Sequence, residues 1–197
     1  MRIIGNKYSM FTYKPVSLPE LAHIQREVLS IIHSNKYAHN TLHDVYSPKF
    51  FSNCTHLKQT IDSLIPWNLI SQINIVSHAP SIVSAHVDDL NGYYGLLNGI
   101  TFNIPIYNCK DTACNFYQPL APPTLVTPDD LAGEGIKFNK PYWSFTEIKS
   151  IDSMKGNTAG LFNTQVPHMP VNTTKEHRIV LSLRYLHDVD VMGYFKD

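Results

Sequence analysis

Residues 178–185 read RIVLSLRY, a stretch in which two kinds of side chain alternate. On a β-strand successive side chains point to opposite faces of the sheet. Every second residue from Arg178 to Arg184 would therefore share one markedly polar face, and every second residue from Ile179 to Tyr185 would share an apolar one. The alternation predicts a strand whose apolar face covers a core and whose polar face meets a partner for the guanidinium groups.

Short runs of β-branched and aromatic residues, separated by Pro, Gly and Asn, extend from Asn68 to this strand. This pattern is typical of an all-β sandwich or barrel, and no helical stretches alternate with the strands as a parallel α/β fold would require. The predicted strands cover residues 69–78, 82–88, 99–107, 113–118, 135–138, 142–147, 159–164, 166–171 and 177–186. The proline-rich stretch 118–135 is predicted to be a long loop.

Two amphipathic helices precede the strands. Ser17 followed by Glu20 predicts a capping box at the start of a helix over residues 18–34. Apolar residues at helical spacing predict a second helix over 54–65, which Pro66 would end.

Together these elements predict a mainly β fold of the α+β kind, a double-stranded β-helix or jelly roll with buttressing N-terminal helices. The chain has 197 residues, 43% of them hydrophobic, which suits one compact domain over residues 1–197. Within it we expect helical support in 1–67, the jelly-roll core in 68–186 and a tail in 187–197.

Charge and cysteine content limit the classes of partner. Sixteen basic residues balance sixteen acidic ones, so no broad positive field favours nucleic acid or an anionic membrane. Cys54, Cys109 and Cys114 lack the spacing of a zinc motif and cannot all pair as disulfides. Neither a leader-like nor a membrane-spanning apolar run is present in the sequence, so we expect a cytoplasmic protein with reduced thiols.

The segment SAHVDDL places His86 and Asp88 two residues apart, and on a strand both would lie on one face. Alone this pattern is weak, because ten histidines produce such a pair by chance about half the time. His168 lies on the next-to-last predicted strand, which a jelly roll can bring beside an early strand. Two imidazoles and one carboxylate would then hold a metal on one side, which suits Fe(II).

Ten residues after His168 comes Arg178. An unpaired guanidinium inside a barrel would be costly, so an anion is expected there. A dicarboxylate cosubstrate would supply one, bound through two parallel hydrogen bonds. Arg184 shares this face and is the substitute anchor.

The chain at this point resembles the 2-oxoglutarate/Fe(II)-dependent oxygenases of the double-stranded β-helix superfamily. The resemblance rests on HVDD, FNIPIYNC with a following FY, NTQVPH and RIVLSLRY, and covers roughly residues 70–186. It is to small phage-type and marine bacterial members, and to the prolyl and aspartyl/asparaginyl hydroxylase-like branch.

The resemblance implies a dioxygenase that uses Fe(II), 2-oxoglutarate and O2, forms succinate and CO2, and hydroxylates a small-molecule or peptidyl substrate. His86, Asp88 and His168 would be the metal ligands and catalytic residues. Arg178 would bind the far carboxylate of 2-oxoglutarate. Further cosubstrate contacts are assigned to the residues His78, Asn103 and Tyr117.

Two other classes of protein are open at this stage. A non-oxidative cupin-like metal protein or isomerase shares the jelly roll, but it has no need for Arg178. A structural, capsid-type jelly roll would need no metal and leaves the polar face of 178–185 unexplained. Among neighbouring residues, Asp89 should face away from the metal, and the NGYYG segment at 91–95 is the candidate lid.

Overall fold

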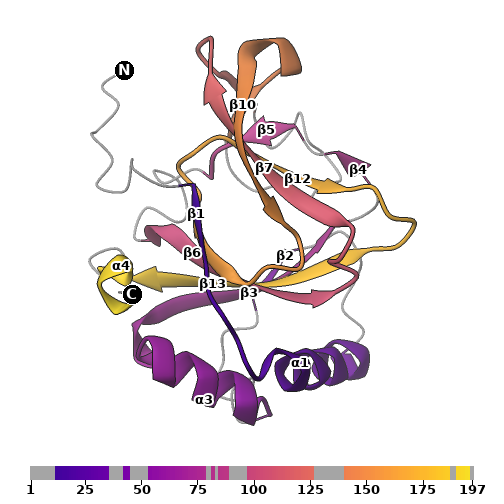
Figure 1. Ribbon diagram of the computed structural model, residues 1–197, viewed down its shortest axis with the longest axis vertical. Helices are drawn as coiled ribbons and strands as arrows, with labels where there is room; N and C mark the ends of the chain where they lie inside the picture. Colours follow the sequence, from indigo (N-terminus) through magenta and orange to yellow (C-terminus); the bar gives the residue numbers. More distant parts are fainter. Residues whose placement is uncertain are drawn as a thin grey trace.

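The computed structural model describes residues 12–35, 42–44, 53–78, 81–82, 84–88, 97–126, 140–186 and 190–195. In these residues the strands form two antiparallel sheets, with helices on the outer side of the first sheet (Figure 1). The elements in chain order are β1 (Tyr13–Pro15), α1 (Leu21–Asn35), β2 (Leu42–Asp44), α3 (Thr55–Leu64), η1 (Trp67–Leu69), β3 (Ile70–His78), β4 (Ser81–Ile82), β5 (Ala85–His86), β6 (Leu97–Tyr107), β7 (Thr112–Pro119), β8 (Thr124–Val126), β9 (Lys140–Trp143), η3 (Phe145–Glu147), β10 (Ile148–Lys155), β11 (Gly160–Asn163), β12 (His168–Asn172), β13 (Arg178–Leu186) and α4 (Val191–Tyr194).

The first sheet has the order β1-β11-β6-β13-β3-β2. Strand β13 lies between β6 and β3, and Leu181 is opposite Ile104 on one side and Ile75 on the other. Register partners in a sheet point to the same face. Leu181 and Leu183 therefore meet apolar residues of both neighbours. Ser182 and Arg184, on the other face, meet polar residues of both.

Helices α1 and α3 cover the apolar face of this sheet (Figure 1). Ile24 and Val28 of α1 and Leu57 and Ile61 of α3 are fully buried there. Burial of such side chains is the main favourable term in folding, at roughly 25 cal/mol per Å² of apolar surface. No helix in the described part of the chain is long and apolar enough to cross a membrane.

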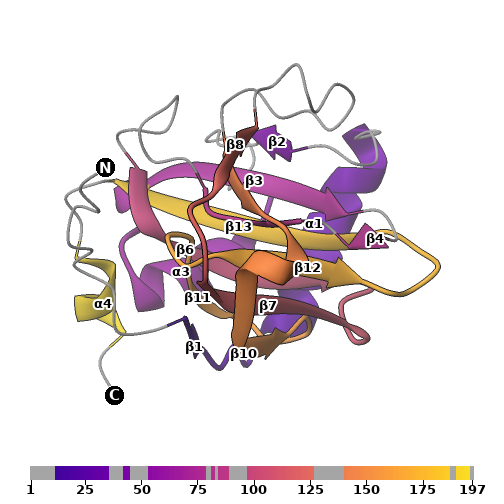
Figure 2. The ribbon, with the colours of Figure 1, turned by 90° about the horizontal axis from the view of Figure 1, so that it is seen from above.

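The second sheet has the order β10-β7-β12-β5-β9-β8, with β4 also pairing with β12. It lies over the first sheet on the side away from the helices, as the view from above shows (Figure 2). The two inner faces enclose the space into which the polar side of β13 points. The fold is thus rich in antiparallel β structure, as predicted.

Both predicted helices are confirmed as α1 and α3. However, α1 begins at Leu21, so Ser17 and Glu20 do not form the predicted capping box. Glu20 instead accepts the backbone N–H of Ile24 with its carbonyl, and its carboxylate contacts His23.

Most predicted strands also have counterparts, as β3, β6, β7, β11, β12 and β13. The predicted strand at 82–88 is two short strands, β4 and β5. The predicted strand at 142–147 is wrong in its second half, because Ser144 and Glu147 form a capping box that starts η3. The predicted strand 135–138 lies outside the described residues.

Four strands were not predicted, and two of them, β1 and β2, lie in the N-terminal part where only helices were expected. β8 lies within the supposed loop 118–135, and β10 follows η3. β10 is an edge strand whose side chains are mostly exposed, so it carries no alternation of polar and apolar residues. Cys54, Cys109 and Cys114 are free and buried.

Tyr185 offers a test of this packing. Its side chain is fully buried and its hydroxyl has no hydrogen-bond partner among the described residues. Burial raises the pKa of this hydroxyl, so it stays neutral. Since an unsatisfied buried hydroxyl is unfavourable, Tyr185→Phe should raise the free energy of unfolding by about 1 kcal/mol in urea denaturation. Tyr107→Phe, at an exposed hydroxyl bonded to Glu176, should change it by less than about 0.5 kcal/mol. A clear destabilisation by Tyr185→Phe would contradict the description of this site.

Candidate metal centre

His86, Asp88 and His168 come together on the inner side of the second sheet. β5 pairs with β12 so that His86 and His168 are direct register partners. Their ring centroids are 4.6 Å apart, and one ligand atom from each of the three residues lies within 4.8 Å of the others. Asp88 follows β5, where its backbone N–H donates to the carbonyl of Thr164 at 3.1 Å. A strand pairing therefore joins His86 to His168, two residues that are far apart in the sequence.

The hydrogen bonds of the two rings fix their tautomers. Nδ1 of His86 lies 2.9 Å from the carbonyl of Ser84, and Nδ1 of His168 lies 2.9 Å from the carbonyl of Val166. A carbonyl oxygen can only accept, so in each neutral ring Nδ1 carries the proton and Nε2 carries the lone pair. Backbone carbonyls commonly orient metal-binding histidines in this way.

Asp88 is oriented by Arg184 of β13. Nη2 of Arg184 donates to Oδ2 of Asp88, while Oδ1 lies 4.0 Å from Nε2 of His86. Both side chains of the ion pair are largely buried. One carboxylate oxygen thus faces the imidazoles and the other is held by a cation.

This donor set fits a divalent transition metal. Two imidazole nitrogens from buried histidines and one carboxylate oxygen from the half-buried Asp88 are donor types that divalent transition metals accept. The ligands alone do not select iron over another metal of this kind.

A cavity of about 160 Å³ adjoins the three ligands. As predicted, one face of β13 lines it, with Arg178, Val180, Ser182 and Arg184. The sequence placed Ser182 on this polar face but predicted no role for it in the site. The three residues and the polar face of β13 thus line one cavity.

The two arginines of β13 differ in their surroundings. Arg184 is bound to Asp88, whereas Arg178 is 4% exposed and its Nε has no hydrogen-bond partner among the described residues. Cys109 and Cys114 lie near Arg178. Burial raises the pKa of Cys114 to about 12 and also raises that of Cys109, and the nearby positive charge only partly offsets this. The neighbouring thiols are therefore neutral and do not balance the guanidinium.

The remaining predicted cosubstrate residues lie in different places. His78, the register partner of Arg178, lines the cavity, and so does Asn103, whose Oδ1 is buried and unpaired within the described chain. Tyr117 packs with another apolar cluster, where its hydroxyl is 4.0 Å from the sulfur of Met169, and it is not among the cavity-lining residues. Phe116 is opposite His168 and takes the inward position, so Tyr117 points the other way.

Thr101 was missed in the sequence. It is 1% exposed, lines the cavity, and its Oγ1 has no partner among the described residues. Its register partner is Arg184, just as Asn103 is opposite Ser182. In the sequence of β6, Thr101 and Asn103 alternate with Phe102 and Ile104. This alternation would have predicted that β6 also has one polar face.

Two aromatic residues of β9 lie close to the site without lining the cavity. Trp143 is buried in an apolar cluster, and its indole N–H donates to the carbonyl of Ala121. Tyr142 lies with its ring centroid 5.5 Å from that of His86. Asp89 and the NGYYG segment at 91–95 lie outside the described residues.

Arg184 should support metal binding without being a ligand. Arg184→Met removes the group that orients Asp88, so we expect metal affinity to fall about 10–100-fold in a Co²⁺ titration followed by calorimetry. Arg178→Met should leave the affinity for Co²⁺ unchanged. His86→Ala, which removes one of the proposed ligands, measures the Co²⁺ binding that does not depend on this site. An equal loss in the Arg184 and Arg178 variants would show that general charge, not orientation of Asp88, controls binding.

Comparisons with known proteins give likenesses of structure only. No family model matches the chain, and no curated protein sequence matches it. Among solved structures, AviO1 from Streptomyces viridochromogenes Tue57 is 10% identical with a TM-score of 0.45, covering 90% of each chain. SnoK, a non-haem alpha-ketoglutarate-dependent carbocyclase from nogalamycin biosynthesis, is 13% identical with a TM-score of 0.48, covering 89% of this chain and 78% of its own. HygX from Streptomyces hygroscopicus, with nickel and 2-oxoglutarate bound, is 11% identical with a TM-score of 0.47, covering 89% and 82%.

Proposed function

We propose that the protein is an Fe(II)- and 2-oxoglutarate-dependent dioxygenase that hydroxylates a small-molecule or peptidyl substrate, with succinate and CO2 as coproducts. The observation that carries the proposal is the meeting of His86, Asp88 and His168 with the buried Arg178 in one cavity. In this interpretation the two sheets are the halves of a double-stranded β-helix, and the cavity lies between them.

Arg178 would bind the cosubstrate. A guanidinium that is 4% exposed and has an unsatisfied Nε needs an anionic partner, because burying an unpaired charge is costly. A carboxylate can satisfy it through two parallel charge-assisted hydrogen bonds. A dicarboxylic 2-oxo acid has a second end that can reach a metal, which explains why Arg178 and the three ligands share a cavity.

The chain's own residues would position the reactants. The carbonyls of Ser84 and Val166 keep the ligand rings in the metal-binding tautomer, and Arg184 holds Asp88. When bound, iron and 2-oxoglutarate would supply the activation of O2 and the oxidising equivalents. Apolar cavity residues such as Val180 and Phe162 would help to exclude water from the reaction.

The rest of the cavity wall suits a polar, uncharged group. Thr101, Asn103 and Ser182 line it, and the first two have buried oxygens without partners in the described part of the chain. These oxygens would be satisfied by hydrogen-bond donors of a ligand or by water. With a formal net charge of zero, neither nucleic acid nor a membrane is the proposed partner.

The alternative is a non-oxidative, cupin-like metal protein. It would account for His86, Asp88 and His168 equally well, but it leaves Arg178 buried without a function. A structural jelly roll without chemistry explains neither the fixed imidazole tautomers nor the unsatisfied polar atoms in the cavity. The oxygenase proposal accounts for all of these features together.

The deciding experiment is an anaerobic titration of metal-free protein with Fe(II) and then 2-oxoglutarate. A visible metal-to-ligand charge-transfer band should appear after the second addition, because the 2-oxo acid chelates the iron. It should be absent from His86→Ala and present in His33→Ala, a change at an exposed histidine at the end of α1. Iron binding without the band would favour the cupin-like alternative, and no binding would favour the structural one.

Arg178 can be tested separately by steady-state kinetics of 2-oxoglutarate turnover. Arg178→Ala should raise the apparent Michaelis constant for 2-oxoglutarate by the equivalent of about 2–3 kcal/mol, the contribution of one charged hydrogen-bonded pair. Lys175→Ala, at an exposed residue in the connection before β13, should leave it unchanged. A normal constant in the Arg178 variant would mean that another group, with Arg184 the first candidate, binds the cosubstrate.

A further inference from the structure

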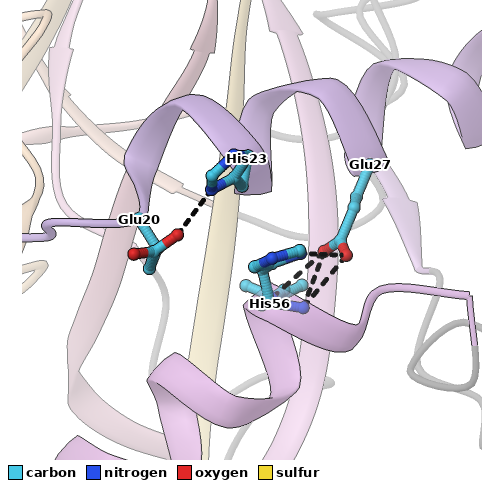
Figure 3. Close-up of polar contacts among 5 residues, drawn as sticks. Glu20, His23, Glu27 and His56 are labelled. Carbon is cyan, nitrogen blue, oxygen red and sulfur yellow. Dashed lines mark hydrogen bonds and ion pairs between the residues drawn. The ribbon is translucent and has the colours of Figure 1, made fainter.

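A second group of metal-binding side chains lies where α1 meets α3, as Figure 3 shows. Glu20 immediately precedes α1, His23 is in its first turn, and His56 is in the first turn of α3. One ligand atom from each of the three residues lies within 4.8 Å of the others. The helices cover the face of the first sheet that is opposite the cavity, so this group is separate from the metal centre described above.

The two imidazoles lie face to face across the gap between the helices. Their centroids are 4.6 Å apart and their planes are inclined by 28°. This geometry brings ring nitrogens of both histidines close together, and a neutral imidazole binds a metal through such a nitrogen.

Each imidazole also contacts a carboxylate. Nδ1 of His23 is 2.5 Å from Oε2 of Glu20, within hydrogen-bonding distance. The hydrogen bond from His23 lowers the pKa of Glu20, so this carboxylate is ionised at neutral pH. A divalent ion can take the place of a proton between two such donors, because deprotonated ligands are what a metal requires.

Glu27 holds His56 in place. Its carboxylate lies 2.8 Å from Nδ1 of His56 and accepts the backbone N–H groups of His56 and Leu57 at 3.0–3.2 Å (Figure 3). Burial opposes ionisation of Glu27, but the hydrogen bonds from His56 and Leu57 outweigh it and lower its pKa. Since the carboxylate accepts from Nδ1, a neutral His56 ring carries its lone pair on Nε2. This carboxylate–histidine pair is the arrangement that supports many zinc ligands.

We propose that Glu20, His23 and His56 form a second metal site, which binds a Zn²⁺-like divalent ion and ties the start of α1 to the start of α3. Two imidazoles and one carboxylate are a known three-ligand set for zinc, with water completing the coordination. The imidazoles disfavour Mg²⁺ and Ca²⁺, which prefer oxygen ligands. The side chains of the three residues are 42–50% exposed, so the ion can enter from solvent and the ligands can adjust around it.

The expected effect of the ion is on stability rather than on turnover. Ile24 of α1 and Leu57 of α3 are fully buried in the main core, close in sequence to the proposed ligands. A metal that binds only the folded arrangement of the two helices stabilises that arrangement by mass action. Zn²⁺ should therefore raise the melting temperature even when the metal centre in the cavity is disabled.

The test uses the full chain, freed of metal with a chelator, and Zn²⁺ alone as the probe. Calorimetric titration of His86→Ala should show one saturable site at micromolar Zn²⁺, accompanied by a rise in melting temperature. Adding His56→Ala, or His23→Gln as a second variant, should abolish both signals, while adding His33→Ala, a change elsewhere on α1, should preserve them. Adding Glu27→Gln should weaken binding by about tenfold, because the orienting carboxylate is lost.

The proposal is overturned if His86→Ala shows no saturable Zn²⁺ binding, or if binding persists unchanged in the His56 and His23 variants. Melting temperatures without Zn²⁺ identify any variant that does not fold, and the other ligand variant then decides the question. A loss of binding in His33→Ala equal to that in His56→Ala would likewise overturn it, since it would indicate nonspecific binding to surface histidines.

Discussion

The structure depends on the two-sided character of β13. Because β13 lies between β6 and β3, both of its edges are used for backbone hydrogen bonds. Its side chains therefore act only through the two faces of the sheet. Leu181 and Leu183 are fully buried on the helical side. Arg178 and Arg184 are fixed on the other side by the same alternation. The packing that stabilises the fold therefore also determines where the charges of the cavity lie.

The second sheet contributes His86, Asp88 and His168, and the pairing of its strands brings these residues together. β5 is only two residues long, yet His86 within it is opposite His168 of β12. The backbone carbonyls two residues before each histidine then orient the rings. The local hydrogen bonds and the strand register together fix the orientation of both rings, and at the proposed metal site this order would reduce the cost of binding.

The sequence allowed the main features of this arrangement to be predicted where alternation was strong, as in β13, β6 and the two helices. It failed where alternation was absent. β10 is exposed on most positions, and β8 is three residues long beside two prolines, so neither carries a periodic signal. The position of Tyr117 could not be predicted for another reason. Which side chains of β7 point into the cavity depends on its pairing with β12, where Phe116 is opposite His168, and this pairing cannot be read from β7 alone. The ion pair of Arg184 with Asp88 likewise depends on how closely the two sheets approach.

That ion pair is also a mechanical link. Arg184 belongs to a central strand of the first sheet, and Asp88 follows β5 of the second sheet. Their ion pair therefore connects the two sheets across the cavity. A change in the distance between the two sheets would therefore shift the carboxylate of Asp88 relative to the imidazoles of His86 and His168. The affinity of the proposed metal centre would then depend on the distance between the sheets, because Arg184 of one sheet positions a ligand that belongs to the other.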